Sequence, residues 1–408
     1  MFSILINAYA CSPNMGSEPG MAWNWCVNLA KHCELHIITE GEFRDKIEAV
    51  LPTLPQGKNM HFYYNPVSDE IRRMCWNQGD WRFYKHYRKW QWKTYLMAKE
   101  IIKQHDIDIV HQLNMIGFRE PGYLWKIEDK PFVWGPVDAT DKFPISYLQG
   151  ASVKSKLFIR LKNFLTCLQL RYSTRVRKAA RKASYVISAS TESKNSFKKY
   201  FDIDSPLLNE TGCYPHSDIS KPYKEKDTFD LLWVGKMDFR KQLSIAINTL
   251  AKLDNGNIRL HIVGSGDTSH YKKETEMLGV EKQCVWHGQI SHDGVQKIMQ
   301  ESDLFFFTSV AEGTPHVVLE AIGNALPVVC FNVCGQGDSV NDAVGLKINL
   351  TNPEQSAKDF AEKINYLYNN RDLLQKLSDG CKERQKELSW DNKAKQMVEL
   401  YNKVINNQ

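Results

Sequence analysis

Short apolar runs alternate with helical stretches along nearly the whole chain, and the alternation breaks once, between Tyr214 and Asp227. The interrupting stretch contains prolines, serines and a run of charges, which is typical of a linker. Strands that alternate with helices favour parallel sheets covered on both faces. A chain of 408 residues is also longer than one ordinary core supports. We therefore expect an α/β protein with two doubly wound domains in tandem and a cleft between them.

Each apolar run that predicts a strand is short enough to cross one parallel sheet. The expected strands are Ser3–Ala8, Glu34–Thr39, His61–Tyr64, Ile107–His111, Pro131–Trp134, Ser184–Ser188, Phe229–Val234, Arg259–Val263, Cys284–His287, Leu304–Thr308 and Pro327–Phe331. The expected helices include Met21–Lys31, Gln242–Leu253, Val317–Gly323 and Trp390–Ile405. The last of these has apolar and aromatic residues at helical spacing, which suits a helix that packs across the domains.

The net charge of +6 is modest, but basic residues gather in two stretches. Residues 142–191 hold eleven Lys or Arg and no acid, and residues 72–93 hold seven with Asp80 as the one acid. The second stretch also carries many aromatic residues, a mixture that suits a lipid headgroup layer or single-stranded nucleic acid. A solvated basic helix whose aromatics face the core is the other interpretation. Residues 72–93 and 142–191 would allow peripheral contact with an anionic membrane, and we expect no nucleic acid partner.

The expected cellular compartment is inferred from membrane-span, signal-peptide and cysteine patterns. No apolar stretch approaches the length of a membrane span, and the first residues lack the pattern of a signal peptide. The ten cysteines show no CxxC pair, which indicates reduced, mostly buried thiols. We expect a cytoplasmic protein, placed at the inner face of the membrane if the basic stretches contact lipid.

Glu312 and Glu320 flank a turn between an apolar run and a helix. The run Asp303–Ser309 predicts a buried strand, and residues 313–315 supply a tight loop, a cap and a proline suited to a first helical position. The amides of residues 314–317 would point out of the helix N-terminus, where phosphate binds readily. Carboxylates beside such a site are expected to bond sugar or ribose hydroxyls. A capped surface helix with solvated acids is the alternative.

Two further loops follow the first strand of each expected domain. Gly16 and Gly20 are four residues apart, so their loop is neither a dinucleotide fingerprint nor a Walker loop, but Gly16 permits close approach of a ligand. Lys236, Arg240 and Lys241 follow the strand that ends at residue 234. Cations at a strand end can neutralise a diphosphate without a metal. A basic surface loop would show the same residues.

Three more residues lie where strands end. Gly264 and His287 belong to glycine-containing turns that can admit a flat base, although such turns are common. His111 ends the strand that begins at Ile107, so we expect its ring to face the cleft, with a structural histidine as the alternative. The Asp-Ile-Asp tripeptides, which end at Asp108 and Asp204, lie in a strand and a loop, so no metal site is expected.

The order and spacing of these motifs resemble the family 4 retaining glycosyltransferases of the GT-B fold, of the bacterial cell-surface and capsular polysaccharide type. The resemblance extends over nearly the whole chain. Its motifs are Ala10–Gly20, Val133–Pro136, Asn209–Gly212, Glu312–Pro315, Glu320–Gly323, Leu326–Val329 and Ser389–Asp391.

The resemblance implies an arrangement of domains. Residues 1–213 would form an acceptor-binding Rossmann-like domain and residues 214–228 a linker. Residues 229–388 would form the nucleotide-sugar-binding Rossmann-like domain. Residues 389–408 would be a C-terminal helix that returns to the N-terminal domain.

The resemblance also implies roles for residues. Those implied in catalysis are Glu312, Lys241, Lys236 and His111. Those implied in donor binding are Gly16, Gly264, His287, Gly313, Thr314, Pro315, His316, Val317 and Glu320. The family usually has arginine where this chain has Lys236, which keeps the charge but loses the bidentate fork.

The implied activity is a metal-independent, retaining transfer of a hexosyl group. The donor would be a UDP- or GDP-sugar, with no cofactor, and the acceptor a glycan, expected to be linked to lipid, in surface polysaccharide synthesis. A sugar-nucleotide epimerase or hydrolase on the same scaffold is the alternative, and a non-catalytic sugar-nucleotide or polyanion binder is a third.

Overall fold

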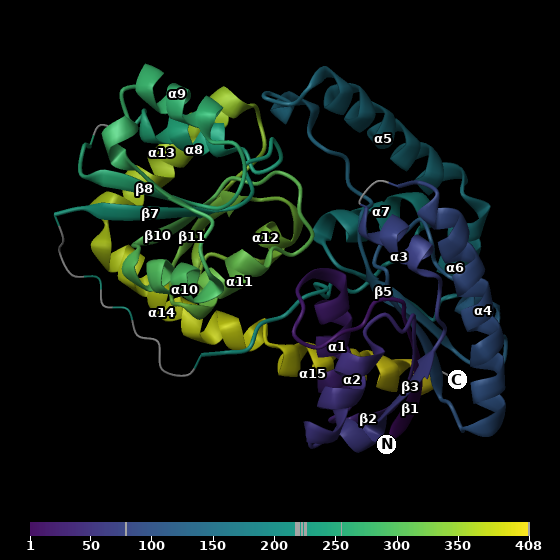
Figure 1. The fold of residues 1–408 in the computed structure, drawn as a ribbon. Helices are drawn as coiled ribbons and strands as arrows, with labels where there is room; N and C mark the ends of the chain where they lie inside the picture. The colour runs from purple at the N-terminus through teal and green to yellow at the C-terminus, as the bar shows by residue number, and fades with distance from the viewer. Residues whose placement is uncertain (78–79, 217–220, 222, 224–226, 254, 407–408) are drawn as a thin grey trace. The chain divides into compact units, whose positions relative to one another are not determined.

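The computed structural model describes residues 1–77, 80–216, 221, 223, 227–253 and 255–406, which form two compact units (Figure 1). Unit 1 contains Met1–Asp141, Thr166–Thr211 and Trp390–Gln408, and unit 2 contains Lys142–Leu165 and Gly212–Ser389. The segment Lys142–Leu165 thus belongs to unit 2, although it lies within the residues predicted for the N-terminal domain. Most of the predicted linker, residues 217–220, 222 and 224–226, lies outside the described residues.

Unit 1 is built on a parallel six-stranded sheet in the order β3-β2-β1-β4-β5-β6. Its strands are β1 (Phe2–Ala8), β2 (Cys33–Thr39), β3 (Met60–Tyr64), β4 (Ile109–Asn114), β5 (Phe132–Val137) and β6 (Tyr185–Ser188). Each predicted strand of this half is present. The predicted strand from Ile107 is shifted, because β4 begins at Ile109 and continues to Asn114.

Helices cover both faces of the unit 1 sheet. They are α1 (Ser17–Leu29), α2 (Arg44–Val50), α3 (Asp69–Trp76), α4 (Phe83–Gln104), α6 (Thr174–Lys182), α7 (Thr191–Phe201) and α15 (Trp390–Asn406), with 3-10 turns η1 (Leu51–Thr53), η2 (Gly57–Asn59) and η3 (Leu124–Lys126). Because side chains alternate along a strand, Ile4 of β1 joins the core under α1 and α15, whereas Leu5 joins the core under α4, α6 and α7.

Unit 2 repeats the topology with the order β12-β11-β10-β7-β8-β9, again all parallel. Its strands are β7 (Phe229–Val234), β8 (Ile258–Val263), β9 (Cys284–Gly288), β10 (Leu304–Phe307), β11 (Val328–Phe331) and β12 (Gly345–Ile348). The edge strand β12 was not predicted. Its four residues include Gly345 and Lys347, so the apolar run is too short to signal a strand.

The helices of unit 2 form two layers around this sheet (Figure 1). They are α8 (Leu243–Leu250), α9 (Ser269–Met277), α10 (His292–Glu301), α11 (His316–Gly323), α12 (Cys334–Ser339), α13 (Pro353–Asn369) and α14 (Arg371–Glu387), with turns η4 (Ile145–Tyr147) and η5 (Glu281–Gln283). Helices α8 and α13 pack together over one face, while α11 packs on α14 over the other. Helix α5 (Val153–Tyr172) has residues in both units.

The topology fixes where each sheet has room for a ligand. In unit 1 the chain runs outward from β1 to β3 and then returns to the other side at β4. In unit 2 the same reversal separates β7 from β10. Loops diverge at such a switch point, so the carboxyl ends of its two strands are where open α/β sheets bind ligands. None of the described helices is both long and apolar enough to cross a membrane.

Candidate functional site

The loop after β7 and the loop after β10 are tied together at the switch point of unit 2. The Thr308 hydroxyl donates a hydrogen bond to the carbonyl of Lys241 (2.8 Å) and accepts one from the Trp233 indole (2.9 Å). The amide of Val310 donates to the carbonyl of Arg240 (3.1 Å). These bonds hold the backbone of both loops, so the side chains that they carry are positioned by the sheet.

Lys241 and Glu312 form an ion pair across these two loops. The Nζ–Oε1 distance is 2.5 Å, and each side chain is 18% exposed. The Ser309 hydroxyl donates to the same carboxylate oxygen. The cation also lies over the Phe307 ring, with Nζ 5.3 Å from its centroid. A partly exposed ion pair at a strand end can exchange its partner for an incoming anion, because neither charge is fully buried.

Helix α11 follows Glu312 and begins at His316, one residue before the predicted helix Val317–Gly323. Pro315 has φ −73° and ψ 118°, so it is extended and precedes the first helical residue, His316. The predicted assignment of Pro315 to the first turn and of Thr314 to the cap is therefore wrong. The amides of His316 and Val317 still belong to the first turn, where helical amides lack partners within the helix.

Helix α12 supports the same loop from behind. The amide of Gly335 donates to the carbonyl of Gly313 (3.1 Å), and a Cβ on Gly335 would lie 2.5 Å from Thr314 Oγ1. Buried Gln336 donates from Nε2 to the carbonyl of Ser309 (3.0 Å). Sequence reasoning missed Ser309, Gly335 and Gln336. The Gly-Gln-Gly sequence at residues 335–337 was the signal that could have pointed to this supporting turn.

Glu320 lies in surroundings different from those of Glu312. Its carboxylate accepts a hydrogen bond from Gln296 Nε2 at 3.3 Å and lies 3.6 Å from His292 Nε2, both on α10. The side chain is 32% exposed. The two glutamates therefore point to separate partners, and neither serves as the proton partner of the other in this arrangement.

The other cations of the loop after β7 are placed less tightly. Lys236 is exposed, and its carbonyl accepts from the amide of Asp238 (2.8 Å). Arg240 is paired with Asp238, with 2.7 Å between Arg240 Nη2 and Asp238 Oδ2. Lys241 is thus the cation held directly against a predicted catalytic carboxylate, and Lys236 is free to move on its four-carbon stem.

Gly264 and His287 make contacts within unit 2 that sequence spacing did not reveal. Gly264 has φ +149°, and a Cβ there would lie 1.7 Å from the carbonyl oxygen of Gly235. Close packing of two strand-end loops therefore requires this glycine. The His287 ring lies against His261, with 3.0 Å between Nε2 and Nδ1, and His261 reaches Asp230 at 3.1 Å. Burial, followed by the charge of His261, lowers the pKa of His287.

In unit 1, the loop after β1 leads into α1. Gly16 is exposed and precedes the first helical residue, and a Cβ there would meet no atom of the described residues within 4 Å. At Gly20 a Cβ would lie 1.7 Å from the Met15 carbonyl oxygen, so packing of the loop requires glycine at this position. Gly16 is open to a ligand, whereas Gly20 shapes the loop.

The predicted strand-end position of His111 is wrong. It is the third residue of β4 and is fully buried, because β4 continues past the predicted strand end to Asn114. Its Nδ1 lies 2.6 Å from the Tyr401 hydroxyl and its Nε2 lies 2.6 Å from the Gly135 carbonyl oxygen. Burial lowers the pKa of His111 to about 4, which favours the neutral ring. Its proposed catalytic role would require this ring to leave both partners.

Two buried carboxyl groups near the switch point of unit 1 escaped sequence reasoning. Glu18 accepts from the amide of Ile116 (3.3 Å), and its second oxygen is buried without a hydrogen-bond partner in the described part of the chain. Burial raises the pKa of Glu18 to about 7. Burial, followed by the charge of Glu210, raises the pKa of Asp138. No periodic pattern marks these residues, since Glu18 lies in the first turn of α1 and Asp138 directly follows β5.

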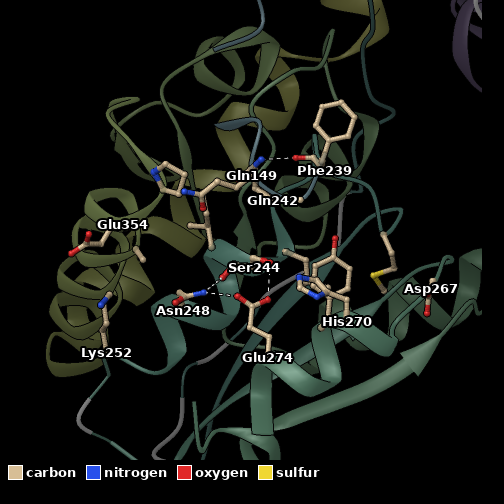
Figure 2. A pocket seen from close by; sticks show the side chains of 17 residues that line it. Gln149, Phe239, Gln242, Ser244, Asn248, Lys252, Asp267, His270, Glu274 and Glu354 are labelled. Carbon is tan, nitrogen blue, oxygen red and sulfur yellow. Dashed lines mark hydrogen bonds between the residues drawn. The ribbon is translucent and has the colours of Figure 1, made fainter. Parts of the chain in front are cut away.

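A separate cavity of about 480 Å³ lies beside the loop after β7, on the α8 and α9 side of unit 2 (Figure 2). Glu274 accepts hydrogen bonds there from Ser244 and Asn248, each at 2.7 Å. Gln242 donates to the Tyr147 carbonyl (2.7 Å), which ties the segment before α5 to unit 2. The cavity adjoins the cationic loop through Gln242.

Solved structures share this architecture. The apo lipopolysaccharide outer core galactosyltransferase WaaB matches with a TM-score of 0.64 and 15% identity, over 100% of this chain and 99% of that one. Anabaena HepE in complex with UDP matches with a TM-score of 0.60 and 14% identity, over 99% and 100%. These likenesses, together with the two parallel six-stranded sheets, confirm the predicted GT-B fold.

Within that fold, residues 217–384 match the family model described as "Glycosyl transferases group 1". This part of unit 2 is therefore a glycosyltransferase group 1 domain. An uncharacterized glycosyltransferase of Methanocaldococcus jannaschii is 29% identical over 42% of this chain and 44% of that protein. The lipopolysaccharide 1,6-galactosyltransferase of Escherichia coli K12 is 28% identical over 30% and 35%. The chain thus spans less than half the length of these relatives.

Proposed function

We propose that this protein is a retaining glycosyltransferase that transfers a sugar from a nucleotide-diphosphate donor to a glycan acceptor. The observation that carries the proposal is the Lys241–Glu312 ion pair. It lies at the switch point of the unit that contains the group 1 domain, beside the first turn of α11. A cation, a carboxylate and helix amides at one strand end match the needs of a donor with a diphosphate and a sugar.

The residues have distinct tasks in this proposal. The diphosphate binds Lys241, in place of Glu312, and the first-turn amides of α11. The Lys236 side chain moves to bind the diphosphate as a second cation. These groups stabilise the negative charge that develops as the leaving group departs. Glu312, released from Lys241, contacts the hydroxyls of the donor sugar, and Glu320 contacts the ribose. Front-face attack, with the leaving phosphate assisting deprotonation of the acceptor, retains the anomeric configuration.

Two lysines and a helix N-terminus can carry the phosphate charge, so we propose a reaction without a divalent metal or cofactor. A UDP-sugar is the favoured donor, since structures similar to this chain include HepE in complex with UDP and glucose. A lipid-linked glycan in surface polysaccharide synthesis is the favoured acceptor, bound by unit 1. Lipopolysaccharide galactosyltransferases among the relatives support this choice.

Glu312→Gln tests the proposal because it keeps the shape of the side chain and removes its charge. We expect sugar transfer from a UDP- or GDP-sugar panel to fall by about 10²–10³-fold, with an unchanged melting temperature. Glu354→Gln, on exposed helix surface, is the control. Full transfer activity in the Glu312 variant would refute the proposal. Donor turnover without any acceptor would favour the epimerase or hydrolase.

Peripheral contact with an anionic membrane, at the cytoplasmic face, is also proposed. Helix α5 exposes large apolar side chains among its basic residues, including Leu157, Phe158, Leu161 and Phe164. In the 72–93 stretch, by contrast, some aromatic side chains are buried in the core and others are exposed to solvent. The buried ones are Phe83, Tyr87 and Trp90, and the exposed ones include Trp76, Trp81 and Trp92. Apolar and basic side chains exposed on one helix suit a headgroup layer.

Liposome flotation tests this contact. Arg82 and Arg88 are engaged with Asp80 and Glu120, so the exposed residues Lys85 and Lys89 are better sites for charge reversal. We expect binding to vesicles rich in phosphatidylglycerol and weaker binding after charge reversal. A Leu157→Ser/Phe158→Ser variant should weaken binding further. Equal binding to neutral vesicles, or no effect of either variant, would contradict the contact.

A further inference from the structure

Two histidines and a glutamate meet on one face of the unit 1 sheet, away from the switch point. His36 of β2 and His61 of β3 are direct partners in the parallel register. Glu34 lies two residues before His36, so it faces the same side of the sheet. β3 is the edge strand. Sheet register alone therefore places two imidazoles and a carboxylate side by side.

The distances within this cluster are close to those of a metal site. One ligand atom from each of Glu34, His36 and His61 lies within 4.8 Å of the other two. Glu34 Oε1 is 3.0 Å from His61 Nε2. The rings of His36 and His61 are stacked, with centroids 5.0 Å apart and planes inclined by 29°. Ligands on one tetrahedral zinc ion stand roughly 3.3–3.6 Å apart, given bonds of about 2.0–2.2 Å.

Small side-chain movements suffice to close the remaining gap. The side chains of Glu34 and His61 are 49% and 42% exposed, so both can rotate without disturbing the core. His36 is buried and provides the fixed member of the cluster. The site thus combines one rigid ligand with two adjustable ones.

A second layer of contacts holds His36 in place. The Tyr63 hydroxyl lies 3.0 Å from His36 Nδ1 and 3.3 Å from Nε2 of His105, the residue that caps α4. Metal-bound histidines characteristically engage their other ring nitrogen in such a bond, which fixes the tautomer. With Nδ1 engaged, Nε2 of His36 is the nitrogen available to an ion.

The chemistry of this set selects a class of ion. Two imidazoles and one carboxylate suit zinc-like transition metals rather than calcium or magnesium, which prefer oxygen ligands.

We propose that Glu34, His36 and His61 bind a divalent transition-metal ion of the zinc class, with water completing its coordination. The ion would join the edge strand β3 to β2. This site is independent of the proposed glycosyl transfer, because its ligands lie in strand interiors rather than in the strand-end loops of either unit.

Titration of the full chain with ZnCl₂ after removal of metal by a chelator tests this site. We expect one high-affinity equivalent and a melting temperature that rises with zinc concentration, because an ion that binds the folded state stabilises it. His61→Gln and Glu34→Gln should each weaken zinc binding at least about tenfold. These exposed ligands are chosen because changing buried His36 could disrupt folding.

Two controls identify the ligands. His86→Gln removes an imidazole of α4 outside the cluster and should leave zinc affinity unchanged. Tyr63→Phe should weaken binding about 10–100-fold without changing the stoichiometry, because it frees the His36 ring. Substituted Co²⁺ should show no thiolate charge-transfer band. The proposal would be overturned by the absence of saturable one-to-one binding or by a thiolate band. It would also be overturned if the His61 and Glu34 variants bound zinc with the same affinity as the parent protein.

Discussion

The two units share one strand order but differ in the chemistry at their switch points. At the β7/β10 edge of unit 2, a partly exposed cation and carboxylate face each other in Lys241 and Glu312. Near the β1/β4 edge of unit 1, the titratable groups are buried, and the pKa values of Glu18 and His111 are shifted towards their neutral forms. Many polar groups at that edge are engaged in hydrogen bonds. For example, Asn114 Nδ2 donates to the carbonyl oxygen of Ala10 (2.7 Å).

This difference shows that the strand order determines where a ligand can bind, whereas the side chains of the loops determine which chemical groups it can bind. An exposed cation at a strand end attracts phosphate, whereas buried carboxyl groups that resist ionisation repel it less and can bond hydroxyls. We therefore expect the charged part of a donor to bind unit 2 and an uncharged, hydroxyl-rich ligand to bind unit 1.

The largest expected effect comes from removing the cation of unit 2. Lys241→Ala should lower kcat by about 10²–10³-fold, since the charge on the leaving diphosphate loses its main partner. Steady-state kinetics with the donor identified from the panel measures this. Lys252→Ala, which removes a lysine of the separate cavity, should retain activity. Equal losses in the two variants would mean that the β7/β10 edge has no special role.

A glycine pair tests the loop at the unit 1 edge. Gly20→Ala should destabilise the protein by about 2–4 kcal/mol, because its Cβ would meet the Met15 carbonyl at 1.7 Å and the loop must shift. Gly16→Ala should cost only about 1 kcal/mol or less, because the new methyl group meets none of the described residues and only the N-cap preference for glycine over alanine is lost. Urea denaturation gives both values. Equal destabilisation would show that the loop is not shaped by Gly20.

The smallest effect concerns the buried carboxyl of unit 1. The pKa of Glu18 is raised to about 7 in the folded protein, so the folded state holds its proton more tightly than the unfolded state does. Stability should therefore fall as the pH rises from about 4.5 to 7, and the loss should remain above pH 7. Glu18→Gln removes this dependence and should be more stable than the parent at pH 8 by up to about 3 kcal/mol, the free energy that corresponds to a pKa rise from 4.5 to about 7.

Chemical denaturation at pH 5 and pH 8 provides the check. The two proteins should differ little at pH 5, where the carboxyl is mostly protonated in the folded state. A difference that is the same at both pH values would contradict the raised pKa of Glu18.

Local patterns in the sequence predicted the fold well and the buried contacts poorly. The apolar run ending near Ser309 and the helix through Glu320 were correct to within a residue or two, because apolar runs and helical periods are local signals. The pairing of Lys241 with Glu312 needs the β7/β10 adjacency, which sequence spacing does not contain. His111 was misplaced because β4 continues to Asn114, three residues past the predicted strand end, which leaves His111 in the strand interior.

The placement of α15 has a consequence for how the chain is assembled. Trp390 packs edge-on against Trp25 of α1, with ring centroids 5.6 Å apart, and Tyr401 supplies the hydroxyl that His111 contacts. A chain emerging from the ribosome therefore makes the sheet of unit 1 first, but must wait for its helical partner until all of unit 2 has followed. An expressed fragment of residues 1–211 would display the bare face of α1. Joining residues 390–406 to that fragment should restore its solubility.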